Sequence, residues 1–261
     1  TTIDDHHLDD QLHGLVQDIE LEYVGSVAFL IPARMAWPLP IYELALMTAA
    51  RAYAMGVEVK LTIVTPEASP LAVFGLGASH AMAELLAKAG VAVELSADAN
   101  VTAKRTIVME PGSRRLEADH IVALPELFGP AVEGLPVARD GFLPVDEFCR
   151  VPGVDHVYAA GDGADFPIKH GGLAAQQADT VALAIAADAG APVEPSPYRP
   201  EIHGMLLTGG APRFITARLV DGQGVDSAIT ETPTWSPPTK IAARYLAPYL
   251  EEAEARRAVA S

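Results

Sequence analysis

Residues 157–162 carry the clearest chemical signal in the sequence, an apolar run that ends in Gly161 and Asp162. The run predicts a strand over residues 157–160, which would place Asp162 where open α/β sheets bind their ligands. A carboxylate at that point accepts hydrogen bonds from ligand hydroxyl groups. Gly161 has no side chain, so the backbone could approach a ligand closely. A Gly-Asp pair alone would indicate only a loop, so the neighbouring residues decide between a loop and a binding site.

That context is a helix that begins shortly after the turn. Lys169 and His170 precede Gly171 and Gly172, and an Ala-rich stretch predicts a helix over residues 171–189. A helix N-terminus carries partial positive charge and uncovered N–H groups, which suit an anion or the polar edge of a ring. His170 could orient a cofactor or substrate, or it could cap the helix, and both roles stay open. Together the turn and the helix start favour a binding site.

These residues resemble the second flavin-binding motif of the pyridine nucleotide–disulfide oxidoreductase superfamily. The resemblance implies that Asp162 hydrogen-bonds the ribityl chain of FAD. It also implies that the helix start lies beneath the pyrimidine edge of the isoalloxazine ring. The cofactor-binding residues implied in this way are Gly161, Asp162, Lys169, His170, Gly171, Gly172 and Ala174.

Within that superfamily the chain looks most like the sulfide:quinone oxidoreductase and type II NADH dehydrogenase branch. The likeness lies in residues 30–47, in Thr65-Pro66-Glu67, in Val145-Asp146-Glu147 and in a β-rich C-terminal unit. It implies an FAD-dependent oxidoreductase that passes electrons from NADH or a sulfide-like donor to an acceptor such as a quinone. The implied partners are therefore small molecules. No catalytic acid, base or nucleophile can be assigned.

The elements that would position this site alternate between strand and helix. Strands are predicted over residues 27–31, 57–64 and 91–95, and helices over residues 41–55 and 78–89. This βαβαβ order predicts a right-handed, doubly wound parallel sheet. An antiparallel excursion over residues 106–117 and a last apolar strand over residues 121–124 follow. Such an inserted excursion suggests the three-layer ββα Rossmann-like domain of FAD/NAD(P)-binding proteins.

Four segments are expected. They are a linker helix in residues 1–21, a degenerate NAD(P)-binding domain in 22–125, the C-terminal half of an FAD-binding domain in 126–195, and a small unit in 196–261. In the last unit, strands are expected over residues 205–207, 214–219 and 227–230, and a helix over 241–257.

The sequence departs from the family pattern at the glycine loops. It contains no Gly-x-Gly-x-x-Gly, the motif that binds the pyrophosphate of FAD and of NAD(P)H. The turn after the first strand holds Trp37, and its Pro32 and Pro38 have no N–H to donate. Arg34 could still hold an anion there. We therefore expect a C-terminal fragment or processed product that binds FAD weakly by itself, and NAD(P)H binding is doubtful.

The cysteine and histidine residues give little support to a catalytic thiol or a metal site. Cys149 is the only cysteine, so a persulfide role would need a second thiol, and a small buried or loop residue is the simpler interpretation. His6, His7 and His13 lack the spacing of zinc ligands. We expect no metal site.

Five aromatic residues could line a quinone pocket, although aromatic residues at helical spacing more often form core. Tyr245 and Tyr249, four residues apart, would pack the last helix in that second interpretation. The full set is Trp37, Tyr42, Trp235, Tyr245 and Tyr249.

The composition limits the partners. Against 34 Asp and Glu stand 18 Lys and Arg, a net charge of −16 that disfavours nucleic acid and anionic lipid. No run of 18 apolar residues occurs that could span a membrane. Glu251, Glu252 and Glu254 follow the last aromatic residues, and their charge disfavours docking on lipid. We therefore expect a cytoplasmic protein.

Two other functions remain open. One is a non-catalytic Rossmann-type domain for protein contacts or anion binding without flavin. The other is an NADH dehydrogenase whose dinucleotide site has been remodelled. If the first strands of the flavin domain are missing, the exposed edge of the strand at residues 157–160 should find an unusual partner within the chain or be covered in a homo-oligomer.

Overall fold

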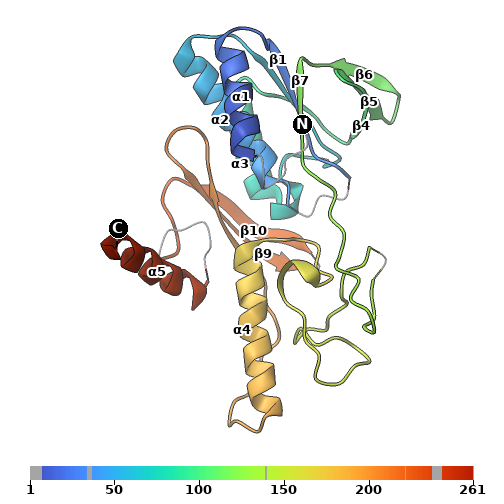
Figure 1. Cartoon of the computed structure of the whole chain (residues 1–261), viewed down its shortest axis with the longest axis vertical. Coiled ribbons are helices and arrows are strands. Elements are labelled where there is room, and N and C mark those ends of the chain that lie inside the picture. Colours follow the sequence, from blue (N-terminus) through green and yellow to red (C-terminus); the bar gives the residue numbers. More distant parts are fainter. Residues whose placement is uncertain (1–7, 34–36, 139, 221, 237–242, 261) are drawn as a thin grey trace.

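A four-stranded parallel sheet organises the first half of the chain (Figure 1). The computed structural model describes residues 8–33, 37–138, 140–220, 222–236 and 243–260. The strand order is β3-β2-β1-β7, so the central strand β1 has a parallel partner on each side. The strands are β1 (Ser26–Leu30), β2 (Lys60–Val64), β3 (Ala92–Glu94) and β7 (His120–Ala123).

Side chains of β1 alternate between two layers. Val27 and Phe29 point into the main core, which the helices cover, whereas Ala28 and Leu30 pack in a second cluster against an antiparallel sheet. Because both faces are covered, the strand is apolar without interruption. The helices are α1 (Leu8–Glu20), α2 (Leu39–Met55) and α3 (Leu76–Lys88), and the antiparallel strands are β4 (Asp98–Ala103), β5 (Thr106–Glu110) and β6 (Arg114–Glu117). The expected three-layer α/β Rossmann-like architecture is confirmed.

Several predicted boundaries are wrong, among them the starts of the C-terminal strands expected at residues 205 and 227, and two of the differences have local reasons. Strand β2 begins at Lys60 rather than at residue 57, because the N–H of Val57 still bonds the Ala52 carbonyl at the end of α2 (3.1 Å). The last helix, α5 (Leu246–Ala260), begins later than residue 241. A helix from residue 241 would put Pro248 in its interior, where proline removes a hydrogen bond, whereas Pro248 fits in the first turn.

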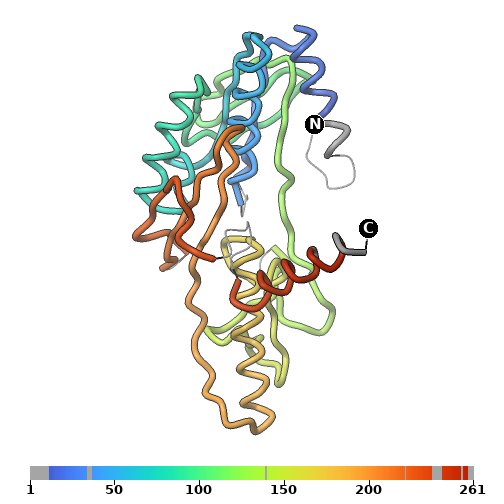
Figure 2. The backbone as a smooth tube through the Cα atoms, turned by 90° about the vertical axis from the view of Figure 1, so that its left-hand side faces the viewer, coloured from blue at the N-terminus to red at the C-terminus, as the bar shows by residue number. Residues whose placement is uncertain are grey.

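The strand predicted at residues 157–160 does not form. Its only ladder contact is an isolated antiparallel bridge between Arg150 and Tyr158. The N–H of Val151 bonds the Val157 carbonyl (2.9 Å), and the N–H of Ala159 bonds the Cys149 carbonyl (3.0 Å). The chain leaves β7 as an extended segment and runs away from the parallel sheet, so no described strand lies in parallel beside this segment (Figures 1 and 2). The segment thus pairs within the chain, one of the two expected outcomes.

The second half consists of one long helix and a small antiparallel sheet. A 3₁₀ turn, η2 (Gly161–Gly163), leads to α4 (Gly171–Asp188), and the sheet has the order β10-β9-β8. Gln176 of α4 binds the edge of β8 like a further strand, because its amide bonds both the carbonyl and the N–H of Glu201 (2.8 and 3.0 Å). The strands are β8 (Glu201–Leu206), β9 (Arg213–Val220) and β10 (Gln223–Thr230).

The C-terminal sheet packs directly on the parallel-sheet unit, as both views show (Figures 1 and 2). After β8, the N–H of Leu207 donates to the Glu43 carboxylate of α2 (2.9 Å). Strand β10 touches the first turn of α3, where a Cβ on Gly77 would lie 2.1 Å from the Ser227 carbonyl oxygen. Only a residue without a side chain permits this approach of one backbone to the other.

This contact predicts that Gly77→Ala destabilises the fold. The added methyl group has to push β10 away from α3, which should lower the free energy of unfolding by roughly 1–3 kcal/mol. Urea unfolding followed by circular dichroism measures the change. Gly14→Ala in α1 is the matched control, since nothing lies within 4 Å of a Cβ there and alanine should stabilise the helix by roughly 0.5–1 kcal/mol. Equal free energies of unfolding for the two variants would contradict a close backbone contact between α3 and β10.

Candidate functional site

The turn at Gly161–Gly163 lies against the first two turns of α4. The N–H of Gly161 donates to Oε1 of Gln177 (2.7 Å), and Gly161 has a φ of 76°, which glycine adopts without strain. A Cβ on Gly161 would lie 3.4 Å from the Cβ of Ala174. The tertiary structure therefore brings the predicted turn and the predicted helix start together, with Asp162 exposed on the turn.

The residue before α4 does not cap the helix with its side chain. His170 precedes the helix in an extended conformation, and its side chain makes no capping hydrogen bond. The first two helical residues, Gly171 and Gly172, have no side chains to cover the N–H groups of the first turn. Such uncovered donors, with the helix dipole behind them, stabilise an anion or an electron-rich ring edge.

Lys169 is turned inward rather than toward the open side of the turn. Its side chain is buried, its ammonium group donates to the carbonyl of Ala164, and it lies 4.0 Å from the centre of the Phe142 ring. Burial lowers the pKa of Lys169, and the carboxylates of Asp162 and Asp165 act in the opposite direction. Lys169 thus holds the loop together and places positive charge beneath Asp162.

His170 makes an aromatic contact with the parallel-sheet unit. Its ring stacks on Trp37 with 4.5 Å between centroids and 28° between planes. Trp37 also contacts Phe74, which is fully buried, with 5.2 Å between ring centroids and 55° between ring planes. The loop between β1 and α2 therefore reaches the start of α4, a contact that the sequence did not predict.

Gln177 is a site residue that the sequence interpretation missed. Its side chain is 2% exposed, and Nε2 has no hydrogen-bond partner among the described residues, although Oε1 accepts from Gly161. A buried donor without a partner costs roughly 1–3 kcal/mol, so native proteins rarely leave one. The available signal was its spacing, since Gln177 shares a helix face with His170 and Ala174.

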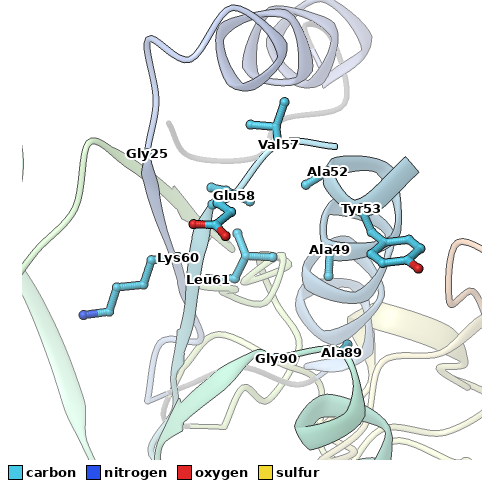
Figure 3. A pocket seen from close by; sticks show the side chains of 11 residues that line it. Gly25, Ala49, Ala52, Tyr53, Val57, Glu58, Lys60, Leu61, Ala89 and Gly90 are labelled. Atoms are coloured by element: carbon cyan, nitrogen blue, oxygen red, sulfur yellow. The ribbon is translucent and has the colours of Figure 1, made fainter. Parts of the chain in front are cut away.

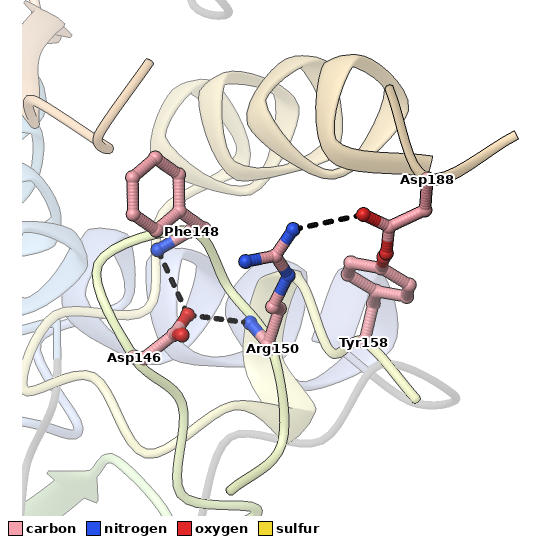
Figure 4. A network of polar contacts seen from close by, with 5 residues as sticks. All are labelled: Asp146, Phe148, Arg150, Tyr158 and Asp188. Carbon is pink, nitrogen blue, oxygen red and sulfur yellow. Dashed lines mark hydrogen bonds and ion pairs between the residues drawn. The ribbon is translucent and has the colours of Figure 1, made fainter. Parts of the chain in front are cut away.

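A polar network fastens the segment before the turn to the far end of α4 (Figure 4). Arg150 forms an ion pair with Asp188 (3.1 Å), and the Tyr158 hydroxyl donates to the same carboxylate. These contacts lower the pKa of Asp188, through the Tyr158 hydrogen bond first and the Arg150 charge second. Asp146 accepts from the N–H groups of Phe148 and Arg150 (both 2.8 Å) and closes the preceding loop.

Cys149 lies in this loop and is fully buried. Burial raises the pKa of its thiol to about 11, and the nearby Asp146 adds to that shift. The buried, protonated thiol agrees with a small packed residue rather than with a nucleophile.

We expect the native protein to resist thiol reagents. With the Cys149 pKa at about 11, only about one thiolate in a thousand would be present near pH 8, and the sulfur is covered. Titration with a chromogenic disulfide should release almost no product until denaturant is added, and then one equivalent. Rapid release from the folded chain would contradict the burial of this side chain.

A second buried polar cluster lies beyond the carboxyl end of β2. The carboxylate of Glu67 accepts hydrogen bonds from the hydroxyls of Tyr42 (2.6 Å) and Thr65 (3.0 Å), and both donors are fully buried. Burial raises the pKa of Glu67, while these hydrogen bonds oppose the shift. Burial is also the main cause that raises the pKa of Tyr42, followed by the charge of Glu67.

The raised pKa of Glu67 predicts a pH-dependent stability. An acid whose folded pKa exceeds its ordinary value of 4.5 stabilises the fold below pH 4.5 and loses that contribution as pH rises through the folded pKa. Wild type should therefore lose stability relative to Glu67→Gln from pH 4.5 upward. Urea unfolding across this range measures the difference, with Glu58→Gln as the control for removing one exposed charge. A pH-independent difference would refute the prediction.

Two open hollows formed by described residues lie elsewhere. One, of about 570 Å³, lies between the amino end of β2, the carboxyl end of α2 and the turn at Gly90 (Figure 3). Ligands of open α/β sheets bind at the opposite, carboxyl edge. A second, of about 660 Å³, is a groove between α1 and α2. Neither contains a residue of the predicted cofactor site.

The other predictions have mixed outcomes. The aromatic residues considered for a quinone pocket do not converge, since Tyr42 is buried in the core whereas Tyr245 and Tyr249 are 62% and 65% exposed. Tyr245 and Tyr249 therefore do not pack the last helix into the core. Trp235 packs instead on His203 and Phe214 of the C-terminal sheet. Arg34, His6 and His7 lie outside the described residues.

Metal-ligating clusters and membrane-spanning helices are both absent from the described ranges. Among those residues, no group of three His, Cys, Asp or Glu side chains could hold a metal ion. No helix in the described part of the chain is both long and apolar enough to cross a membrane.

A model of the pyridine nucleotide-disulphide oxidoreductases matches residues 43–187, more than half of the chain. No curated protein sequence matches the chain.

Solved structures share the fold at low identity. The sulfide:quinone oxidoreductase of Aquifex aeolicus superposes with a TM-score of 0.72 at 17% identity, covering 88% of this chain and 60% of that chain. A NAD-dependent persulfide reductase from A. fulgidus superposes with a TM-score of 0.54 at 15% identity, and the match covers 84% of this chain and 40% of that chain. LpdA from Mycobacterium tuberculosis superposes with a TM-score of 0.52 at 17% identity, and the match covers 76% of this chain and 40% of that chain. The chain thus spans 60% or less of the length of these structures.

Proposed function

Since the chain belongs to the pyridine nucleotide-disulphide oxidoreductase family, we propose that it forms the carboxyl part of an FAD-dependent oxidoreductase. Asp162 would bind the ribityl hydroxyls, and the start of α4 would lie under the pyrimidine edge of the isoalloxazine ring. Bound FAD would supply the electron-transfer chemistry. The protein's part is to hold the ring and to stabilise the negative charge of its reduced form through the uncovered N–H groups of α4.

The contact that carries this proposal is the one between the Gly161–Gly163 turn and α4. It gathers the exposed carboxylate of Asp162, the donors of the first helical turn, and the buried Nε2 of Gln177, which has no partner among the described residues. These groups match the polar edge of a flavin, which offers acceptors on its ring and hydroxyls on its ribityl chain. Asp162 suits the hydroxyls, and the helix start suits the ring acceptors.

The residues present fit only one half of the cofactor. The sequence holds no Gly-x-Gly-x-x-Gly for the FAD pyrophosphate. We therefore expect weak FAD binding by these 261 residues alone. The proposed division is a linker helix in residues 1–21, a nucleotide-binding-type unit in 22–125, half of a flavin unit in 126–195, and a terminal unit in 196–261.

The donor and acceptor of the proposed reaction are a small reductant and an acceptor such as a quinone. The superposition on the Aquifex aeolicus enzyme supports this choice at the level of the fold. A non-catalytic domain for protein contacts is the second candidate. Two exposed tyrosines favour it, Tyr245 directly before α5 and Tyr249 in its first turn, since exposed aromatic residues are enriched where proteins associate.

Flavin binding tests the proposal. We expect the purified chain, titrated into FAD, to raise the fluorescence anisotropy of the flavin with a saturable, weak affinity. Asp162→Ala should reduce that affinity about tenfold or more, because a hydrogen bond to a charged group contributes roughly 1.5–3 kcal/mol. Riboflavin, which lacks the pyrophosphate, should bind comparably, because the chain holds the ring and ribityl chain rather than the phosphates.

Asp165→Ala is the matched control. Asp165 lies on the same loop, is exposed, and like Asp162 acts on the Lys169 pKa. Equal loss in both variants would indicate a general charge effect rather than ribityl binding. If neither FAD nor riboflavin binds the chain at any concentration tested, the proposal is refuted and the non-catalytic candidate remains.

A further inference from the structure

We infer that Trp37 is a specificity-determining residue that closes the route of a nicotinamide ring to the flavin helix and so restricts the electron donor to a small, non-nucleotide reductant. This inference rests on the proposed flavin site at the start of α4. It adds to that function a named side chain and the chemical class of the donor.

A dinucleotide donor has to enter from one direction. In open α/β units, the dinucleotide lies across the carboxyl edge of the sheet, with its pyrophosphate at the turn after the first strand. Its nicotinamide ring must then extend from that turn to the flavin. In this chain the corresponding turn follows β1 and ends at Trp37, and the indole of Trp37 stacks on His170 directly before α4 (4.5 Å, 28°). The space between the turn and the flavin helix is therefore filled by an aromatic side chain of the protein.

The indole of Trp37 contacts two aromatic side chains from different segments. Phe74, which follows β2 and is fully buried, contacts Trp37 at 5.2 Å. Trp37 is partly buried against the main core, and Pro38 directly after it is also buried. A ring in contact with two aromatic neighbours on different segments cannot swing aside without losing both contacts.

Two further contacts of a dinucleotide are also occupied or missing at described residues. Pro32 and Pro38 supply no N–H at the turn. Glu67 is the first acidic side chain after β2, where an acidic residue commonly binds the ribose hydroxyls in this type of unit. Here its carboxylate accepts hydrogen bonds from the buried hydroxyls of Tyr42 and Thr65. A small reductant needs neither the turn nor the ribose partner, so the arrangement excludes dinucleotides and leaves such donors unaffected.

The test removes the indole and asks what fills its place. Trp37→Gly should open a slot beside the His170 ring, on which a planar ring can stack, with Phe74 at its edge. We use two probes, indole and reduced nicotinamide mononucleotide, each titrated by calorimetry with and without FAD. Indole reports whether the slot exists, and the mononucleotide reports whether a nicotinamide can enter it.

Trp235→Gly is the matched control. Trp235 also contacts one histidine and one phenylalanine, His203 and Phe214, but on the C-terminal sheet. Opening that second slot tests whether any aromatic gap accepts the nicotinamide. Thermal unfolding of both variants shows whether each remains folded.

Wild type should bind neither probe in the millimolar range. Trp37→Gly should bind indole and should gain about tenfold or more in affinity for the mononucleotide, since the ring regains two aromatic contacts. Trp235→Gly should not gain affinity for the mononucleotide. The inference is overturned if wild type already binds the mononucleotide, if Trp37→Gly binds indole but not the mononucleotide, or if it remains folded and binds neither.

The outcome is separable from that of the proposed function. The titrations without FAD report on the Trp37 slot alone, because indole and the mononucleotide need no flavin. Failure of FAD and riboflavin to bind wild type, with the Trp37→Gly gain intact, would refute the flavin site and leave the blocked route standing. Normal flavin binding without any gain in Trp37→Gly would refute the role of Trp37 only.

Discussion

Two stretches of backbone meet without side chains between them where the first turn of α3 touches β10, and the placement of the whole second half depends on that contact. A Cβ on Gly77 would lie 2.1 Å from the carbonyl oxygen of Ser227, so the distance is set by the backbones themselves. The C-terminal sheet is thereby fixed on the parallel-sheet unit. Through Gln176, which bonds both backbone groups of Glu201, the sheet then fixes α4. His170, at the head of α4, consequently meets Trp37.

Polar groups around the start of α4 differ from those elsewhere in the molecule. Near the far end of α4, Arg150 and Tyr158 both bind Asp188, and beyond β2 the carboxylate of Glu67 accepts two buried hydroxyls. At the helix start, by contrast, the side chain of the N-cap residue His170 does not cap the first turn, and Nε2 of Gln177 has no partner within the described residues. Buried donors without a partner are rare in native proteins, and such donors favour a binding site. This contrast is the physical basis of the flavin proposal.

Several elements were predictable because their signals are local. The uninterrupted apolar run of β1 reflects coverage on both faces, and the glycines at 161 and 171 mark a turn and a helix start wherever the rest of the chain lies. The strand at residues 157–160 was wrongly predicted from the same kind of run. An apolar run indicates that a segment is suited to pairing, but it does not supply the neighbour, and here only the backbone near Arg150 is available. The start of α5 was predicted too early, although the signal that sets it is local. Pro248 fits only in the first turn of a helix, so the helix cannot begin at residue 241.

By itself, then, the sequence determined the parallel α/β unit, the Gly161-Asp162 turn and the helix that follows, because periodicity and glycine placement act over a few residues. The tertiary structure alone decided what those parts face. Whether Trp37 lies on His170, whether Glu67 is engaged by Tyr42, and whether Gln177 is left with an open donor all depend on side chains far apart in the chain. Such contacts are set by how the elements pack, and no local pattern encodes them.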